Sequence, residues 1–131
     1  RMLTDNEFII ACTALYAILG HVFPIFFGFK GGKGVATLIG TLFGFWWVLG
    51  LIFVVTWLIV AVITRYSSLS ALVATVVASV SVIFTANLQV ATPFLIGAIL
   101  ILVKHKGNIQ RLISGQESKI GDKAKSEAKA K

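Results

Sequence analysis

Long apolar runs separated by short polar segments make up most of the chain. The first run, residues 8–23, is long enough for one helix and follows a polar start. Residues 24–34 interrupt it, because this segment holds a proline and four glycines, which sit poorly in a helix interior. The pattern therefore predicts a helix over 8–23 and a loop over 24–34.

The second run, residues 35–64, contains thirty residues without a charge. One helix of this length would be about 45 Å long, against a bilayer core of about 30 Å. A hairpin turning near residues 44–50, where two glycines flank paired tryptophans, gives two arms of about 15 residues each. We favour the hairpin, and the single long helix is the alternative.

Three further segments complete the pattern. Ser67 and Ser68 are suitable N-caps for a helix over 69–85. Residues 86–93 are predicted to be a polar loop, and 94–103 a last span that continues toward Arg111. The fold class is therefore an all-α, polytopic integral membrane bundle with about five transmembrane helices. We assign residues 1–114 to this domain and 115–131 to a polar, Lys-rich, disordered cytoplasmic tail.

Charge placement supports a membrane protein. Residues 8–103 hold only Lys30, Lys33 and Arg65 as charged residues, and no Asp or Glu lies between Glu7 and Glu117. Charged residues make up 13% of the chain, against about 25% in soluble domains. This excludes a water-soluble core and a catalytic carboxylate pair within the apolar block. The net charge of +7, mostly near the C-terminus, indicates an anionic lipid surface rather than nucleic acid.

Counting basic residues does not separate the two topologies. Of the twelve Lys and Arg residues, the hairpin puts eleven on one side of the membrane and only Arg1 on the other. The single helix gives ten against two, so both topologies satisfy the positive-inside rule. Only the hairpin places the loop at 28–34 and the basic segment at 104–111 on the same face.

The glycine-rich loop is the first candidate for chemistry. Glycines let backbone N–H groups approach an anion, and Lys30 and Lys33 add full charge, so residues 28–34 could cradle a phosphate. The loop is not a P-loop, because Lys33 is followed by Gly34 rather than Ser or Thr. The alternative is a flexible basic loop that only sets membrane topology.

The second candidate is the segment 104–112. In a helix, His105, Asn108 and Arg111 follow one another at three-residue spacing on one face. They offer a titratable imidazole, an amide and a guanidinium that can grip a phosphate. A basic membrane anchor is the alternative there, and it is the simplest interpretation of Arg65. No metal site or cofactor is expected, since the two histidines and one cysteine lie far apart in sequence.

Two long segments resemble signatures of one family. Residues 21–37, from His21-Val22-Phe23-Pro24 to Gly34-Val35-Ala36-Thr37, resemble the second signature of the PlsY family of bacterial membrane acyltransferases. Residues 105–117 resemble its third signature, and 64–69 are also similar to the family. The resemblance covers about residues 8–121.

The resemblance implies transfer of an acyl group from acyl phosphate to the 1-hydroxyl of glycerol 3-phosphate. It implies catalytic roles for His105 and Asn108, with either His105 or the substrate phosphate taking the proton. It also implies a bacterial inner-membrane protein with a cytoplasmic active site. The implied substrate-binding residues are His21, Lys30, Gly31, Gly32, Lys33, Gly34, Lys106, Arg111 and Glu117.

One departure from the family stands out. Its first signature, an N-terminal loop with an essential serine and arginine, has no match in this sequence. The chain is therefore expected to be the C-terminal two-thirds of such an enzyme, with the missing part as a partner. A non-catalytic membrane subunit and an anion transporter fragment are the alternatives.

Overall fold

The computed structural model describes residues 7–24 and 31–122 as helices joined by short connections. In chain order the helices are α1 (Glu7–Val22), α2 (Val35–Phe45), α3 (Trp47–Thr64), α4 (Ser67–Thr85), α5 (Leu88–Lys104) and α6 (Lys106–Ile113). The described residues contain no strand. The all-α prediction is confirmed, and each of the five predicted apolar runs forms a helix.

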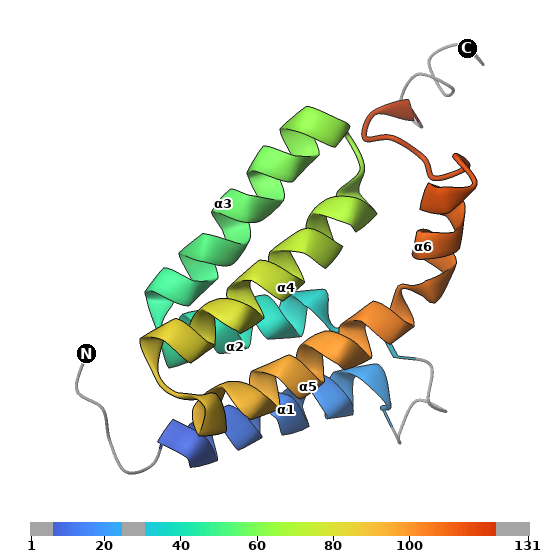
Figure 1. Ribbon diagram of the computed structural model, residues 1–131. Helices are drawn as coiled ribbons and strands as arrows, with labels where there is room; N and C mark the ends of the chain where they lie inside the picture. The colour runs from blue at the N-terminus through green and yellow to red at the C-terminus, as the bar shows by residue number, and fades with distance from the viewer. Residues whose placement is uncertain (1–6, 25–30, 123–131) are drawn as a thin grey trace.

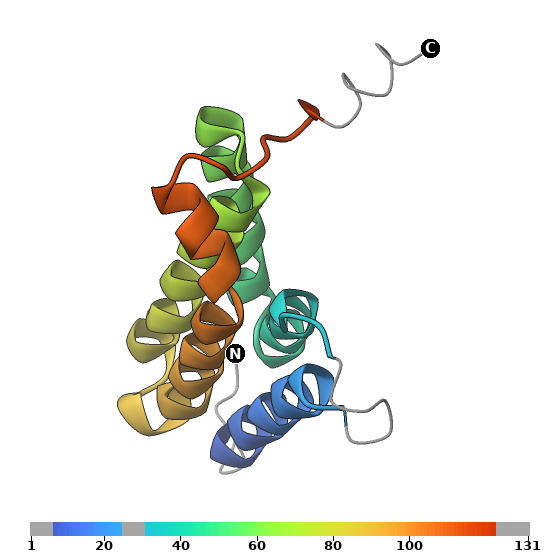
Figure 2. The same ribbon diagram turned by 90° about the vertical axis from the view of Figure 1, so that its right-hand side faces the viewer.

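The helices pack in two groups that share α5. In Figure 1, α3 and α4 run side by side, while α1 lies along α5 and α2 passes behind α4. Figure 2 shows that α1 and α2 lie next to each other, to one side of the other helices. The rings of Phe45 and Phe94 meet edge to face, 5.3 Å apart, and connect α2 to α5.

The thirty-residue run is broken, as the hairpin interpretation predicts. Trp46 is extended, with φ of −158°, and separates α2 from α3. Gly50 lies so close to the Phe43 ring that a Cβ would overlap it, so the corner depends on the missing side chain. The two arms are unequal: α2 has 11 residues, about 16 Å, and does not cross a core of about 30 Å by itself.

Length and composition mark two helices, α3 and α4, as candidate membrane spans within the described residues. The pair α5 and α6 adds a third if it is one span bent by 58°, while α1 and α2 are shorter apolar helices. Apolar side chains on one face of α3, such as Leu58, Val62 and Ile63, are exposed, as expected where lipid covers a helix.

Two boundaries differ from prediction. The expected loop over 86–93 is wrong, because α5 begins at Leu88, where the Asn87 side chain accepts a hydrogen bond of 2.9 Å from Val90 N. The last span does not continue straight to Arg111, because the chain bends at His105. The boundary at residue 114 stays a prediction, although the described residues 115–122 return to the start of α4.

Candidate functional site

A cavity of about 470 Å³ lies where several helix ends meet. The end of α1, the start of α2, the start of α4 and the break between α5 and α6 all contribute to its lining. The lining residues are His21, Lys33, Gly34, Val35, Ala36, Trp57, Ser67, Ser68, Ala71, His105, Asn108, Glu117 and Ser118. Segments far apart in the sequence therefore share one pocket.

The glycines of the α1–α2 loop allow close packing. A Cβ on Gly31 would overlap the carbonyl oxygen of His21 and lie 2.5 Å from that of Val22, and one on Gly32 would overlap the His21 imidazole. Gly34 has φ of +85°, a left-handed conformation that favours glycine, and it precedes the first turn of α2. These glycines place Lys33 beside α6.

Gly31→Ala is expected to destabilise the protein by about 1–3 kcal/mol, because the new methyl group meets backbone atoms that cannot rotate away. Gly40→Ala is the matched control: its Cβ would meet nothing within 4 Å, and alanine favours a helix interior by about 0.5–1 kcal/mol. Thermal unfolding in detergent compares the two variants. Equal midpoints would contradict the packing argument.

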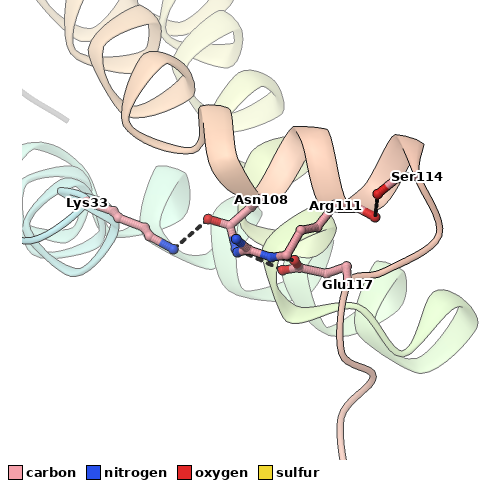
Figure 3. A network of polar contacts seen from close by, with 5 residues as sticks. All are labelled: Lys33, Asn108, Arg111, Ser114 and Glu117. Atoms are coloured by element: carbon pink, nitrogen blue, oxygen red, sulfur yellow. Dashed lines mark hydrogen bonds and ion pairs between the residues drawn. The ribbon is translucent and has the colours of Figure 1, made fainter.

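A chain of polar contacts joins the α1–α2 loop to α6 and to the segment after it (Figure 3). Lys33 Nζ donates to Asn108 Oδ1 at 2.6 Å, and Asn108 Nδ2 donates to Glu117 Oε1 at 2.8 Å. Arg111 Nε donates to the other carboxylate oxygen, Oε2, at 2.7 Å. Asn108 is 8% exposed, so both ends of its amide are used in a largely buried setting.

His105 lies at the break between α5 and α6 and is 3% exposed. Its Nδ1 lies 2.8 Å from the carbonyl oxygen of Ile101. Because a carbonyl oxygen only accepts, Nδ1 carries the proton, and Nε2 of the neutral ring is left as an acceptor. His105 lines the cavity, and Nε2 of its neutral ring can accept a hydrogen bond.

The Glu117 carboxylate is stabilised in its charged form. Ser68, Asn108 and Arg111 lower the pKa of Glu117 from 4.5 to about 2, with Ser68 the largest influence and burial opposing them. Ser68 Oγ is buried and makes no hydrogen bond within the described residues, so it favours the carboxylate as a nearby hydroxyl dipole. Glu117 is thus ionised at neutral pH and keeps Asn108 and Arg111 in place.

This pKa predicts a pH dependence of stability. A group whose pKa is lower in the folded than in the unfolded state stabilises fully above its ordinary pKa and progressively less below it. The difference in thermal midpoint between the parent protein and Glu117→Gln is therefore expected to shrink as the pH falls from about 5 toward about 2. A difference that is the same at every pH would contradict the assignment.

The cavity brings together a large part of the predicted site. The predicted residues in its lining are His21, Lys33, Gly34, His105, Asn108 and Glu117. Arg111 lies outside the lining and reaches the site through Glu117, while Gly31 and Gly32 support the loop. Lys106 is exposed and does not line the cavity, and Lys30 lies outside the described residues.

The cavity lining also includes four residues that were not predicted from the sequence: Trp57, Ser67, Ser68 and Ser118. The prediction that Ser67 or Ser68 caps α4 is wrong: Tyr66 is the N-cap and makes no side-chain capping bond, while both serines line the cavity. The segment 64–69, which resembles the family, was the signal that could have located them.

Known proteins resemble this chain in sequence and in structure. The family model described as glycerol-3-phosphate acyltransferase matches residues 1–115. A protein named glycerol-3-phosphate acyltransferase from Francisella philomiragia subsp. philomiragia is 89% identical over 95% of this chain and 61% of its own length. One of that name from Francisella tularensis subsp. novicida is 86% identical with the same coverage.

Two solved structures share the fold. The crystal structure of PlsY, an integral membrane glycerol 3-phosphate acyltransferase, in its glycerol 3-phosphate form is 36% identical, with a TM-score of 0.83 over 87% of this chain and 57% of that one. The lysophosphatidic acid form gives 33% and 0.77, over 88% and 67%. The chain thus spans about three-fifths of the curated relatives it matches, and it belongs to the glycerol-3-phosphate acyltransferase family.

Proposed function

We propose that this chain carries the transfer of an acyl group from acyl phosphate to the 1-hydroxyl of glycerol 3-phosphate, releasing lysophosphatidic acid and phosphate. The observation that carries the proposal is the 2.6 Å contact between Lys33 and Asn108, which brings two signature segments 75 residues apart to one cavity. The names of the relatives and of the PlsY structures support it.

The cationic groups serve to bind phosphate. Both substrates are phosphorylated, so their negative charges repel each other as the reacting atoms come together. Lys33 lines the cavity and is an exposed residue, so its ammonium can exchange its contact with Asn108 for a phosphate oxygen. The guanidinium of Arg111 adds positive charge next to Asn108. Binding therefore offsets the repulsion between the substrates.

The chemistry requires a new C–O bond and the loss of one proton. The 1-hydroxyl oxygen attacks the acyl carbon, the bond from that carbon to the phosphate oxygen breaks, and phosphate leaves. His105 Nε2 is the protein group arranged to accept the hydroxyl proton, and the leaving phosphate is the other acceptor. The Asn108 amide, held through Nδ2 by Glu117, positions the acceptor substrate.

The setting is a bacterial inner membrane with the cavity facing the cytoplasm. The candidate spans α3 and α4 are apolar, and basic residues follow the cavity end of α5, which fits the positive-inside rule. The acyl chain lies among the apolar helices. We further propose that a segment like the first family signature completes the site as a partner, since the chain covers 61% of its relatives.

The test supplies acyl phosphate and glycerol 3-phosphate to membranes that contain the protein together with this partner segment. Lysophosphatidic acid and inorganic phosphate are expected to form in equal amounts. The same membranes without acyl phosphate are the control. Absence of both products would overturn the proposal, and uptake of glycerol 3-phosphate into vesicles without acylation would instead support a transporter.

A further inference from the structure

The segment that follows α6 pairs with the corner between α3 and α4. Ile120 N donates to the carbonyl oxygen of Arg65 at 2.7 Å, and Arg65 Nη2 donates to the carbonyl oxygen of Ile120 at 2.8 Å. The two residues are 55 positions apart, and each both gives and accepts a hydrogen bond. A simple membrane anchor at Arg65 would require neither contact.

The backbone at Arg65 is unusual. Its φ of +62° is left-handed, and among the described residues it is the non-glycine residue with positive φ. Glycine fits this conformation better, because a Cβ is strained there. Arg65 N also donates to the Ala61 carbonyl oxygen at 2.8 Å and closes α3. The left-handed turn directs its carbonyl and guanidinium to the same partner, Ile120.

The pairing fixes one end of the segment that carries Glu117. At the other end, Gln116 N and Glu117 N donate to the Arg111 carbonyl oxygen at 2.7 and 3.1 Å. Glu117 therefore lies between two attachment points, three residues before Ile120. This arrangement holds its carboxylate against Asn108 and Arg111.

We propose that Arg65 is a positioning residue for the acyl-transfer site: its two hydrogen bonds with Ile120 fix the segment 117–120 and so place the Glu117 carboxylate against Asn108. The catalytic consequence of this pairing rests on the proposed function. The pairing of Arg65 with Ile120 can be measured without an activity assay.

Two variants break the pairing from opposite sides. Arg65→Asn tolerates the left-handed backbone but is too short to reach Ile120 and loses the charge. Ile120→Pro keeps the charge of Arg65 but removes the backbone N–H of residue 120, which donates to the carbonyl oxygen of Arg65. Lys104→Ala is the control, since Lys104 is basic, lies at the end of α5 over the Phe23 ring, and does not line the cavity.

Both variants are expected to lower kcat about tenfold, with KM for acyl phosphate within about twofold. A misplaced polar group stabilises the transition state less well, while the affinity for the substrate changes little. Amide hydrogen exchange across 116–119 is expected to speed up in both variants. In a Glu117→Gln background, Arg65→Asn should reduce kcat by less than about twofold further, because Arg65 acts only by positioning the Glu117 carboxylate.

The outcomes separate the two proposals. An active parent with unchanged kcat and exchange in both variants overturns the positioning role. Loss of activity in Arg65→Asn alone, with Ile120→Pro and Lys104→Ala like the parent, also overturns it and leaves Arg65 as a charge anchor. Failure of the parent to form product overturns the proposed function, and the exchange data still report whether Arg65 and Ile120 are paired.

Discussion

Lys33→Met is expected to lower kcat/KM by about 10²–10³-fold, the loss seen when one charged or polar group that meets developing negative charge is removed. Lys33 is the described lysine that lines the cavity, and its Nζ lies 2.6 Å from Asn108 Oδ1. Methionine keeps the length and apolar stem of the side chain but cannot bind phosphate. The measurement is steady-state acyl transfer in membranes with each substrate varied.

The matched control is Lys104→Met, which removes the same charge from a lysine outside the cavity lining. It is expected to keep kcat/KM within about twofold, since Lys104 does not line the cavity and its ammonium lies over the Phe23 ring instead. A topology loop would give a different pattern. If Lys33 only sets orientation, both variants would lose activity in proportion to the amount of correctly inserted protein, with KM unchanged.

The helices could be predicted from the sequence because lipid imposes a simple rule. Backbone groups in a bilayer must be satisfied within a helix, so uncharged runs ended by Arg65 or by the glycines of 24–34 read directly as helices. The preference for a break near 44–50 also predicted that the two basic segments lie on one side of the membrane, and the Lys33–Asn108 contact shows that these segments meet in the fold. Spacing alone put Asn108 and Arg111 on one face of α6, and both bind Glu117.

The remaining features depend on contacts between distant segments. His105, at the bend, makes a ring-to-carbonyl contact with Ile101, and Pro93 lies inside α5, which begins after the Asn87 cap. Glu117 lies in a segment without apolar periodicity, so the local pattern does not place its carboxylate. Its place depends on Arg65 and Asn108, which are 52 and 9 residues away. No local rule relates such positions.

Asn108→Asp is expected to lower kcat/KM about 10²-fold at pH 8, because a second carboxylate then faces Glu117 at the position of a 2.8 Å hydrogen bond. Two carboxylates in one site raise the pKa of one of them, so the pair takes up a proton as the pH falls. That proton restores a hydrogen bond between the two side chains. The activity of the variant relative to the parent is therefore expected to rise from pH 8 to pH 6.

A compensating change tests whether the hydrogen bond between residues 108 and 117 controls the site. The double variant N108D/E117Q puts the donor on residue 117 and the acceptor on residue 108, which restores the hydrogen bond with its direction reversed and keeps an acceptor for Lys33. It is expected to recover about tenfold of the lost activity and to lose the pH-dependent rise, since no carboxylate pair remains. Full recovery is not expected, because Arg111 then faces an amide instead of a carboxylate. A double variant no better than Asn108→Asp, with the same pH profile, would show that the contact between Asn108 and Glu117 does not control the site.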